Sequence, residues 1–191
     1  MSKLAHCKLT KRRLETNFDF EASLRALKSR LSSKYGCITL MALLFLSCDN
    51  NAVFSEYRSV DGEWDKDERI NFTFQPEDTV SINQLYLHVR NTNEYEFSNL
   101  YLIATLNAPD GLVVTDTLQY EMAKADGTWL GSGFTDVKEN KLWYKQNITF
   151  KKLGEYTIEV GHAMRKNGEV AGITGLKGIT EVGFSIEKAP N

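Results

Sequence analysis

The sequence predicts an all-β domain, a two-sheet β-sandwich of the Ig-like or jelly-roll kind with about seven or eight strands. Apolar residues beyond residue 51 recur mostly with a period of two, which is typical of half-buried strands. Helical spacing is nearly absent there, and Gly-containing turn signals separate the runs. The 144 residues that follow Ser47 are enough for one domain, which at this size hides roughly 68–70% of its unfolded surface.

A charge-free apolar run, residues 37–47, lies near the start of the chain and follows Lys28, Arg30 and Lys34. A helix of about 11 residues rises only ~16 Å, roughly half of a ~30 Å hydrocarbon core, so this run does not span a membrane alone. A basic region followed by a short apolar region is typical of a signal peptide. The run ends at Phe45-Leu46-Ser47-Cys48, which is similar to the lipobox of bacterial lipoprotein precursors.

The lipobox implies cleavage before Cys48 and a diacylglycerol on its sulfur, with an N-acyl lipid on the new amino terminus. We therefore expect a leader, residues 1–47, and a single mature β-sandwich domain, residues 48–191. The alternative is a buried apolar helix with a chance cysteine. Signal peptides typically have 15–30 residues, so residues 1–30 are interpreted either as a start-site artefact or as an extended basic region. Cys48 is the one cysteine left after cleavage, which excludes an internal disulfide.

The first expected strands are residues 70–75 and 84–91. In the second, Leu85, Leu87 and Val89 point to the core, while His88 alternates with them and is expected to face solvent. The acidic segment 61–68 before these strands is interpreted as a solvated lead-in whose Trp64 packs on the first strand. It lacks the spacing of a calcium-binding EF-hand loop.

The next expected strands are residues 99–107 and 112–121. Pro109-Asp110-Gly111 lies between them and predicts a turn, because glycine tolerates a positive φ. Further strands are expected at residues 142–150, 155–161 and 179–187.

Charge and residue types exclude several functions. Fourteen Lys/Arg and twenty-two Asp/Glu follow Ser47, a formal charge of −8, so the mature domain is a poor ligand for nucleic acid or an anionic membrane surface. The mature region has two histidines far apart, which predicts no metal cluster. An enzyme would need His162 beside a carboxylate and a nucleophile, and no such motif is present. We expect no catalysis, no cofactor besides the lipid and no small-molecule substrate.

Several segments in order resemble the GldH family of gliding-motility lipoproteins. They are residues 85–91, 95–102, 116–120, 127–131, 154–156, 162–165 and 178–183. The resemblance implies a non-catalytic component needed for gliding and related to type IX secretion of adhesins. It would act through contacts with other envelope proteins, held on a membrane and facing the periplasm or the cell surface.

Candidate contact residues for such a role are chosen by residue type, because Arg and Tyr are favoured at interface anchors. They are Arg90, Asn91, Tyr95, Phe97, Asn99, Met164 and Arg165. The alternative is that Arg90 and Arg165 merely cap strand ends.

Two further hypotheses concern sugars. Asp78-Thr79-Val80 and Asp116-Thr117-Leu118 are similar to the Asp-Thr-aliphatic acceptor of periplasmic O-glycosylation, which predicts sugars on Thr79 and Thr117. The alternative function is a carbohydrate-binding envelope lipoprotein that uses Trp129, Trp143 and Tyr144 as a platform. Coplanar, solvent-facing rings would favour it.

Overall fold

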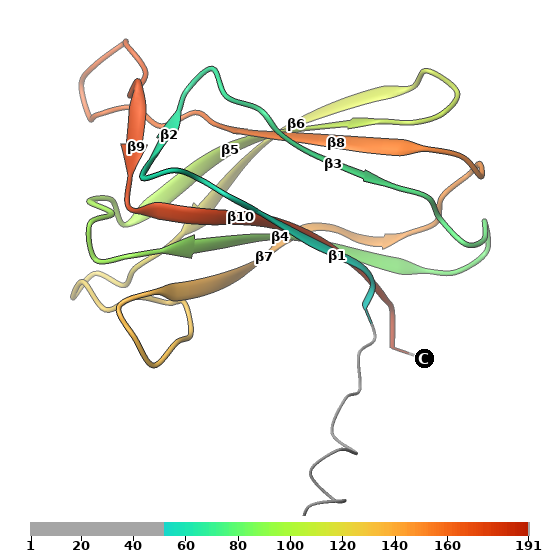
Figure 1. The fold of residues 1–191 in the computed structure, drawn as a ribbon, viewed down its shortest axis with the longest axis horizontal. Helices are drawn as coiled ribbons and strands as arrows, with labels where there is room; N and C mark the ends of the chain where they lie inside the picture. The colour runs from blue at the N-terminus through green and yellow to red at the C-terminus, as the bar shows by residue number, and fades with distance from the viewer. Residues whose placement is uncertain (1–51, 191) are drawn as a thin grey trace, which may run out of the picture. The chain divides into compact units, whose positions relative to one another are not determined.

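The computed structural model describes residues 52–190, which form ten strands in two four-stranded antiparallel sheets and a two-stranded ribbon (Figure 1). The strands are β1 (Ala52–Ser59), β2 (Glu63–Asp65), β3 (Ile70–Phe74), β4 (Asn83–Asn91), β5 (Asn99–Asn107), β6 (Val113–Glu121), β7 (Lys138–Ile148), β8 (Tyr156–His162), β9 (Gly175–Lys177) and β10 (Ile179–Lys188). The first sheet has the order β1-β10-β4-β7, and the second has the order β3-β8-β5-β6. Within residues 52–190, no helix is long and apolar enough to cross a membrane.

The strands pair as one long hairpin that is folded over on itself. The nested pairs are β1 with β10, β2 with β9, β3 with β8, β4 with β7 and β5 with β6. Two further pairs, β10 with β4 and β8 with β5, join the halves into sheets. Nested pairing of this kind is a jelly roll. The predicted β-sandwich is therefore confirmed, and the topology selects the jelly roll over the Ig-like alternative.

The tip of this hairpin is the predicted turn between β5 and β6. Gly111 has a φ of 83°, and its N–H donates to the carbonyl of Ala108 at 3.0 Å. The N–H of Ala108 donates to the carbonyl of Leu112 at 2.8 Å. A residue with a Cβ is disfavoured at such a φ, so the glycine fits the turn.

The seven expected strands correspond to β3 through β8 and to β10, although β7 begins at Lys138, earlier than predicted. Three strands were not expected, namely β1, β2 and β9. The last two have three residues each, which is too short for a periodic pattern. In β1 most residues are partly buried, and apolar and polar residues do not alternate along it. The period-two pattern that predicts a strand is therefore absent from this segment.

The core lies between the two sheets. Alternate residues of β4 and β5 point into it, including Leu85, Leu87, Leu100 and Leu102, which are fully buried. Phe184 of β10 lies at the centre of an aromatic cluster, with the rings of Phe54, Phe72 and Phe74 at 5.5–6.1 Å. Truncation of such a phenylalanine to alanine typically costs about 3–5 kcal/mol.

The prediction that His88 faces solvent is wrong, because its side chain is buried. Strand β4 lies inside the first sheet, and the ring of Tyr57 from β1 covers His88 at 5.3 Å. Tyr57 reaches it across Gly183, where a Cβ would lie 2.7 Å from the tyrosine ring. The Nε2 atom of His88 lies 2.7 Å from the hydroxyl of Ser185.

The acidic segment 61–68 is solvated as predicted, with Asp61, Glu63 and Asp65 exposed. Trp64 is fully buried, but it lies in a strand of its own and pairs with Leu176 of β9. Its ring contacts the ring of His162 at 5.4 Å. The segment is therefore half of a short ribbon rather than a lead-in without secondary structure.

Candidate interaction site

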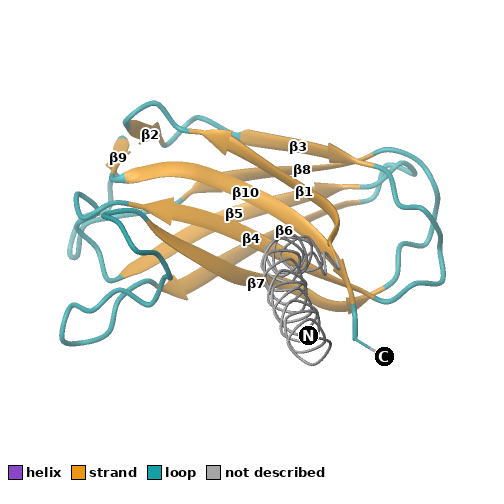
Figure 2. Cartoon of the chain, turned by 60° about the horizontal axis from the view of Figure 1, so that its bottom comes forward, coloured by secondary structure: helices purple, strands orange, loops and turns teal. Residues whose placement is uncertain are grey.

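Connecting loops gather at the two ends of the sandwich (Figure 2). At the end where β4 and β8 finish, the loops 92–98 and 163–174 enclose a groove of about 580 Å³. We call this the loop groove. Its lining residues are Glu96, Phe97, Asn99, Tyr101, Arg165, Lys166, Asn167 and Gly168.

One wall of the loop groove is held by Tyr95, whose side chain is buried beneath it. The Tyr95 hydroxyl donates to the carbonyl of Asn99 at 2.6 Å, and its ring packs edge-on against Phe97 at 5.7 Å. Burial raises the pKa of Tyr95 above its ordinary value, so the hydroxyl stays protonated and remains a donor. The N–H of Thr92 donates to Gly178 at 2.8 Å, which fixes the start of the loop.

The other wall is held by Met164, which is also buried. Its Sδ atom accepts a hydrogen bond from the N–H of Tyr101 at 3.2 Å, and its carbonyl accepts from the N–H of Ile173 at 2.8 Å. Arg165 forms an isolated bridge with Gly172. Each wall is therefore anchored to the core by one buried side chain, and the groove is preformed in the free chain.

The seven predicted contact residues fall into three groups. Phe97, Asn99 and Arg165 line the loop groove together, whereas Tyr95 and Met164 lie in the core beneath it and position it. Arg90 and Asn91 belong to β4 and do not line the groove.

Charge distinguishes the arginines. Within residues 52–190, Arg165 and Lys166 make no ion pair, so both cations are available to an acidic partner. Glu96 is the acidic residue of the groove lining. Arg90, by contrast, is paired with Glu139 at 3.2 Å and with Glu181.

Arg90 belongs to a polar network on the outer face of the first sheet. The hydroxyl of Tyr57 donates to Glu139 at 2.8 Å, and the guanidinium of Arg90 lies 4.7 Å from the centre of the Tyr57 ring. Burial raises the pKa of Glu139, but the hydrogen bond from Tyr57 and the charge of Arg90 lower it more, so its pKa lies below the ordinary value. This geometry fits the alternative in which Arg90 stabilises the strand end.

Asn91 is fully buried, and its amide oxygen accepts a hydrogen bond from Asn140 at 2.9 Å. Asn91 therefore holds β4 against β7 and presents no exposed side chain to a partner. The sequence did not reveal Asn140, Glu139 or Glu181 as partners, because their positions beside β4 depend on strand register.

The three rings of the hypothetical carbohydrate platform point in different directions. Trp143 is half exposed and packs on Tyr86 at 4.4 Å, while the adjacent Tyr144 is buried on the opposite face and donates to Asp116 at 3.0 Å. Trp129 lies outside β7, in the loop between β6 and β7, where its indole N–H donates to Asn93 at 3.1 Å. The prediction of one coplanar platform is therefore wrong.

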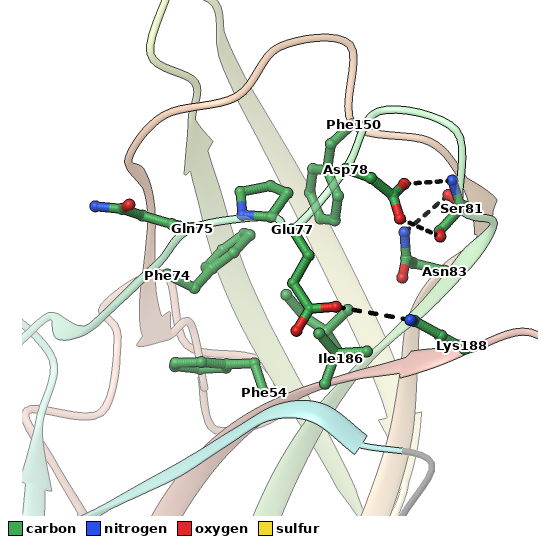
Figure 3. A pocket seen from close by; sticks show the side chains of 12 residues that line it. Phe54, Phe74, Gln75, Glu77, Asp78, Ser81, Asn83, Phe150, Ile186 and Lys188 are labelled. Atoms are coloured by element: carbon green, nitrogen blue, oxygen red, sulfur yellow. Dashed lines mark hydrogen bonds and ion pairs between the residues drawn. The ribbon is translucent and has the colours of Figure 1, made fainter.

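A second pocket lies at the opposite end of the sandwich, beside Phe54, Phe74 and Phe150 (Figure 3). Its volume is about 100 Å³, well below the roughly 300–1,000 Å³ of ligand pockets. An ion pair between Glu77 and Lys188 at 3.6 Å closes one side. This pocket is too small for a ligand of ordinary size.

The two threonines of the glycosylation motifs lie in different settings. Thr79 is exposed in the loop between β3 and β4, whereas Thr117 is exposed within β6. Beside Thr79, the carboxylate of Asp78 accepts hydrogen bonds from the Ser81 hydroxyl at 2.6 Å and from the N–H of Val80 at 2.9 Å. These bonds, that of the Ser81 hydroxyl first, lower the pKa of Asp78 to about 2.

Comparison with known proteins gives a consistent result. A family model described as "GldH lipoprotein" matches residues 52–186. The "Gliding motility lipoprotein GldH homolog" of Christiangramia forsetii is 50% identical over 149 residues, 78% of this chain and 91% of the relative. The "Gliding motility lipoprotein GldH" of Flavobacterium johnsoniae is 43% identical over 153 residues, 80% of this chain and 95% of the relative.

Solved structures show a much weaker likeness. The VP2 subviral particle of infectious bursal disease virus is 15% identical, with a TM-score of 0.30 over 71% of this chain and 34% of that chain. Nothing about function follows from similarity at this level.

Proposed function

Because this chain belongs to the GldH family of gliding motility lipoproteins, we propose that it is a non-catalytic subunit that supports the gliding and secretion machinery through protein contacts. A lipid on Cys48 holds it in the cell envelope, where it faces the periplasm or the cell surface. Cys48 lies outside the described residues, so this part of the proposal is supported by the lipobox and by the lipoprotein family.

The observation that carries the contact role is the loop groove. It combines aromatic side chains, two cations without ion pairs in the described part of the chain, and walls fixed by Tyr95 and Met164. Aromatic residues and Arg are enriched at protein interfaces. The groove therefore suits a partner segment with acidic and apolar side chains.

The position of the groove also fits this role. Strand β10 runs from Ile179 at the groove end to Lys188 at the end where β1 begins. Its ten residues span about 30 Å at roughly 3.3 Å per residue. A protein held near Ala52 would present the groove well away from its point of attachment.

The contact role is tested by reversing both groove charges in the tethered protein, with Arg165→Glu and Lys166→Glu together. We expect about tenfold weaker partner recovery after in-cell cross-linking, which corresponds to about 1.4 kcal/mol, and a loss of gliding in a complemented deletion strain. The matched control is Lys124→Glu with Lys177→Glu, which makes the same charge change at exposed lysines outside the groove. Equal gliding and equal recovery for the two double variants would overturn the role of the groove.

The lipid tether is tested by Cys48→Ala. This variant should incorporate no radiolabelled palmitate and should leave the membrane fraction, because Cys48 is the cysteine of the lipobox and no cysteine follows it. The wild-type protein should incorporate the label. Wild-type protein without palmitate would contradict the tether.

We also propose O-linked sugar on Thr79 and Thr117, supported by their sequence motifs and by the exposure of both threonines. Intact mass of the native mature protein should exceed the lipidated polypeptide mass by a glycan, and Thr79→Ala should remove one glycan unit. A native mass without sugar would end this proposal.

A further inference from the structure

The end of the sandwich opposite the loop groove gathers the start of β1, the end of β10 and three loops. Ala52 pairs with Glu187, and Lys188 pairs with Asn83 at the start of β4. The loops 75–82, 108–112 and 149–155 connect strands that finish at this same end. We call it the tether end, because Ala52 follows Cys48 by four residues.

Five large aliphatic side chains of the tether end are exposed to solvent, all in these loops or directly beside them. Their exposed fractions are 80% for Val80, 52% for Ile82, 56% for Leu112, 56% for Val113 and 60% for Leu153. Clustered exposed apolar side chains mark contacts with proteins or membranes, whereas single ones need no explanation.

These side chains stand on fixed backbone. The N–H of Ala189 donates to the carbonyl of Ile82 at 2.9 Å, and Asp78 holds the turn before Val80. A Cβ on Gly154 would lie 2.9 Å from Pro109, so the loops that carry Leu153 and Leu112 are packed together. The five aliphatic residues are thus held at the same end of the sandwich.

The short segment between Cys48 and Ala52 limits how far the tether end can lie from a lipid on Cys48. Four residues of fully extended chain reach at most about 14 Å. If Cys48 carries acyl chains in a bilayer, Ala52 therefore remains within about 14 Å of the backbone of Cys48, and the end of the sandwich to which Ala52 belongs is the end held near the bilayer. The exposed Leu130, Phe134 and Val170 belong to loops at the groove end, which is the end of the sandwich opposite Ala52.

Charges at the tether end nearly balance. Lys152 pairs with Asp110 at 3.4 Å, and Lys188 pairs with Glu77 at 3.6 Å. The exposed Lys151 and Glu155 of the loop 149–155 carry opposite charges. The surface therefore offers apolar contact rather than attraction to anionic headgroups.

From these observations we infer that the tether end lies against the lipid surface, with Val80, Ile82, Leu112, Val113 and Leu153 inserted at the level of the headgroups. This layer is polar and hydrated, so a sugar on Thr79 beside Val80 would lie among the headgroups and not in the hydrocarbon core. The inference rests on the proposed lipidation of Cys48. It adds an orientation: the jelly roll stands on the membrane with the loop groove pointing away. The aliphatic loops and the acyl chains then form one anchor, which holds more firmly than lipid alone.

The test uses the lipidated protein reconstituted into phosphatidylcholine vesicles, with one cysteine introduced per variant for a polarity-sensitive fluorophore. Residues 52–190 contain no cysteine, and the sulfur of a lipidated Cys48 does not react, so the label is specific. Val80→Cys and Leu153→Cys report on the tether end. Phe134→Cys and Val170→Cys are matched controls, also exposed, at the groove end.

We expect blue-shifted emission at Val80→Cys and Leu153→Cys, at least twofold stronger quenching by nitroxide lipids than at the controls, and quenching of the controls by aqueous iodide. Vesicle flotation is measured first. A protein that floats with all four labels in water would overturn the orientation while leaving the tether intact. A protein that does not float would remove the lipidation itself, and the inference with it.

Discussion

Buried polar side chains hold the first sheet together at the scale of single residues. Asn140 of β7 donates to the carbonyl of Val89 at 3.0 Å and to the side chain of Asn91 at 2.9 Å. Both acceptors lie in the buried part of β4. A buried acceptor that loses its donor costs the desolvation of that group, so Asn140 matters more than its hydrogen bonds alone suggest.

We expect Asn140→Ala to lower the free energy of unfolding by about 1–3 kcal/mol, measured by urea denaturation. Gln146→Ala, an exposed position on the same strand, is the control and should change it by less than about 0.5 kcal/mol. Equal effects of the two changes would show that the buried amide is not needed.

The two buried histidines predict a pH dependence of stability. Burial lowers the pKa of His88, although the charge of Glu139 partly opposes this. Burial also lowers the pKa of His162, with partial opposition from its hydrogen bond to the Trp64 carbonyl at 3.0 Å. Both rings are therefore neutral in the folded state at a pH where the unfolded chain, with an ordinary pKa of about 6.5, binds protons.

Because the unfolded state binds more protons, the free energy of unfolding should fall as the pH drops through about 6.5 towards the lower folded pKa values. Urea denaturation at about pH 7.5, 6.5 and 5.5 checks this, and the slope should be shallower in His162→Gln. Stability that rises between pH 7.5 and 5.5 would contradict the burial of neutral histidines.

At the scale of elements, one glycine fixes the corner between β9 and β10. Gly178 has a φ of 80°, and a Cβ there would collide with the backbone of Glu94 and Tyr95. Its carbonyl also accepts the N–H of Thr92 at 2.8 Å. This corner therefore brings the loop 92–98, one wall of the groove, against the start of β10.

Gly178→Ala should destabilise the protein for two reasons, while Gly168→Ala should do so for one. Gly168 has a φ of 83° but nothing within 4 Å of a Cβ, so its substitution carries the left-handed backbone penalty of about 1–2 kcal/mol. The collision at Gly178 should add about 1–3 kcal/mol. Thermal unfolding of both variants isolates the collision, and equal melting temperatures would argue against it.

Period-two patterns predicted those strands whose outer face is polar and whose inner face is apolar. β3 is such a strand, with Asn71 and Thr73 exposed between buried apolar residues. In β5 buried residues alternate with partly buried ones, and its predicted bounds of 99–107 are confirmed. The pattern failed for His88, because a neighbouring strand supplied Tyr57 as a cover that the local sequence does not show.

The candidate site was predictable in part for the same reason. Residue types favoured at interfaces pointed to the segment 95–99 and to Arg165, and of these candidates Phe97, Asn99 and Arg165 line one groove. Tyr101 and Lys166 were missed, because they join the groove through the pairing of Leu102 with His162, which brings the start of β5 beside the end of β8. That register is set by the fold as a whole and has no local signal.

At the scale of the whole molecule, the nested pairs join residues that are distant in sequence, up to Ala52 with Glu187. Loop-closure entropy delays such contacts, and sandwiches dominated by non-local pairing fold in milliseconds to seconds. We expect refolding after dilution from urea in that range, measured by the fluorescence of Trp64 of β2, whose side chain is fully buried. A Trp64→Phe variant, as the control, identifies how much of the fluorescence change comes from Trp64. Refolding that is complete within microseconds would contradict a folding rate limited by the nested, non-local strand pairs.

The adjacency of Ala52 and Glu187 bears on how the protein can be visualised in living cells. If Cys48 carries the proposed lipid, a fluorescent fusion or epitope that follows β10 would lie close to the bilayer, which would crowd it and shield it from antibodies. An epitope inserted between Asp126 and Gly127, in an exposed turn at the far end, would project outward and label intact cells or spheroplasts more brightly.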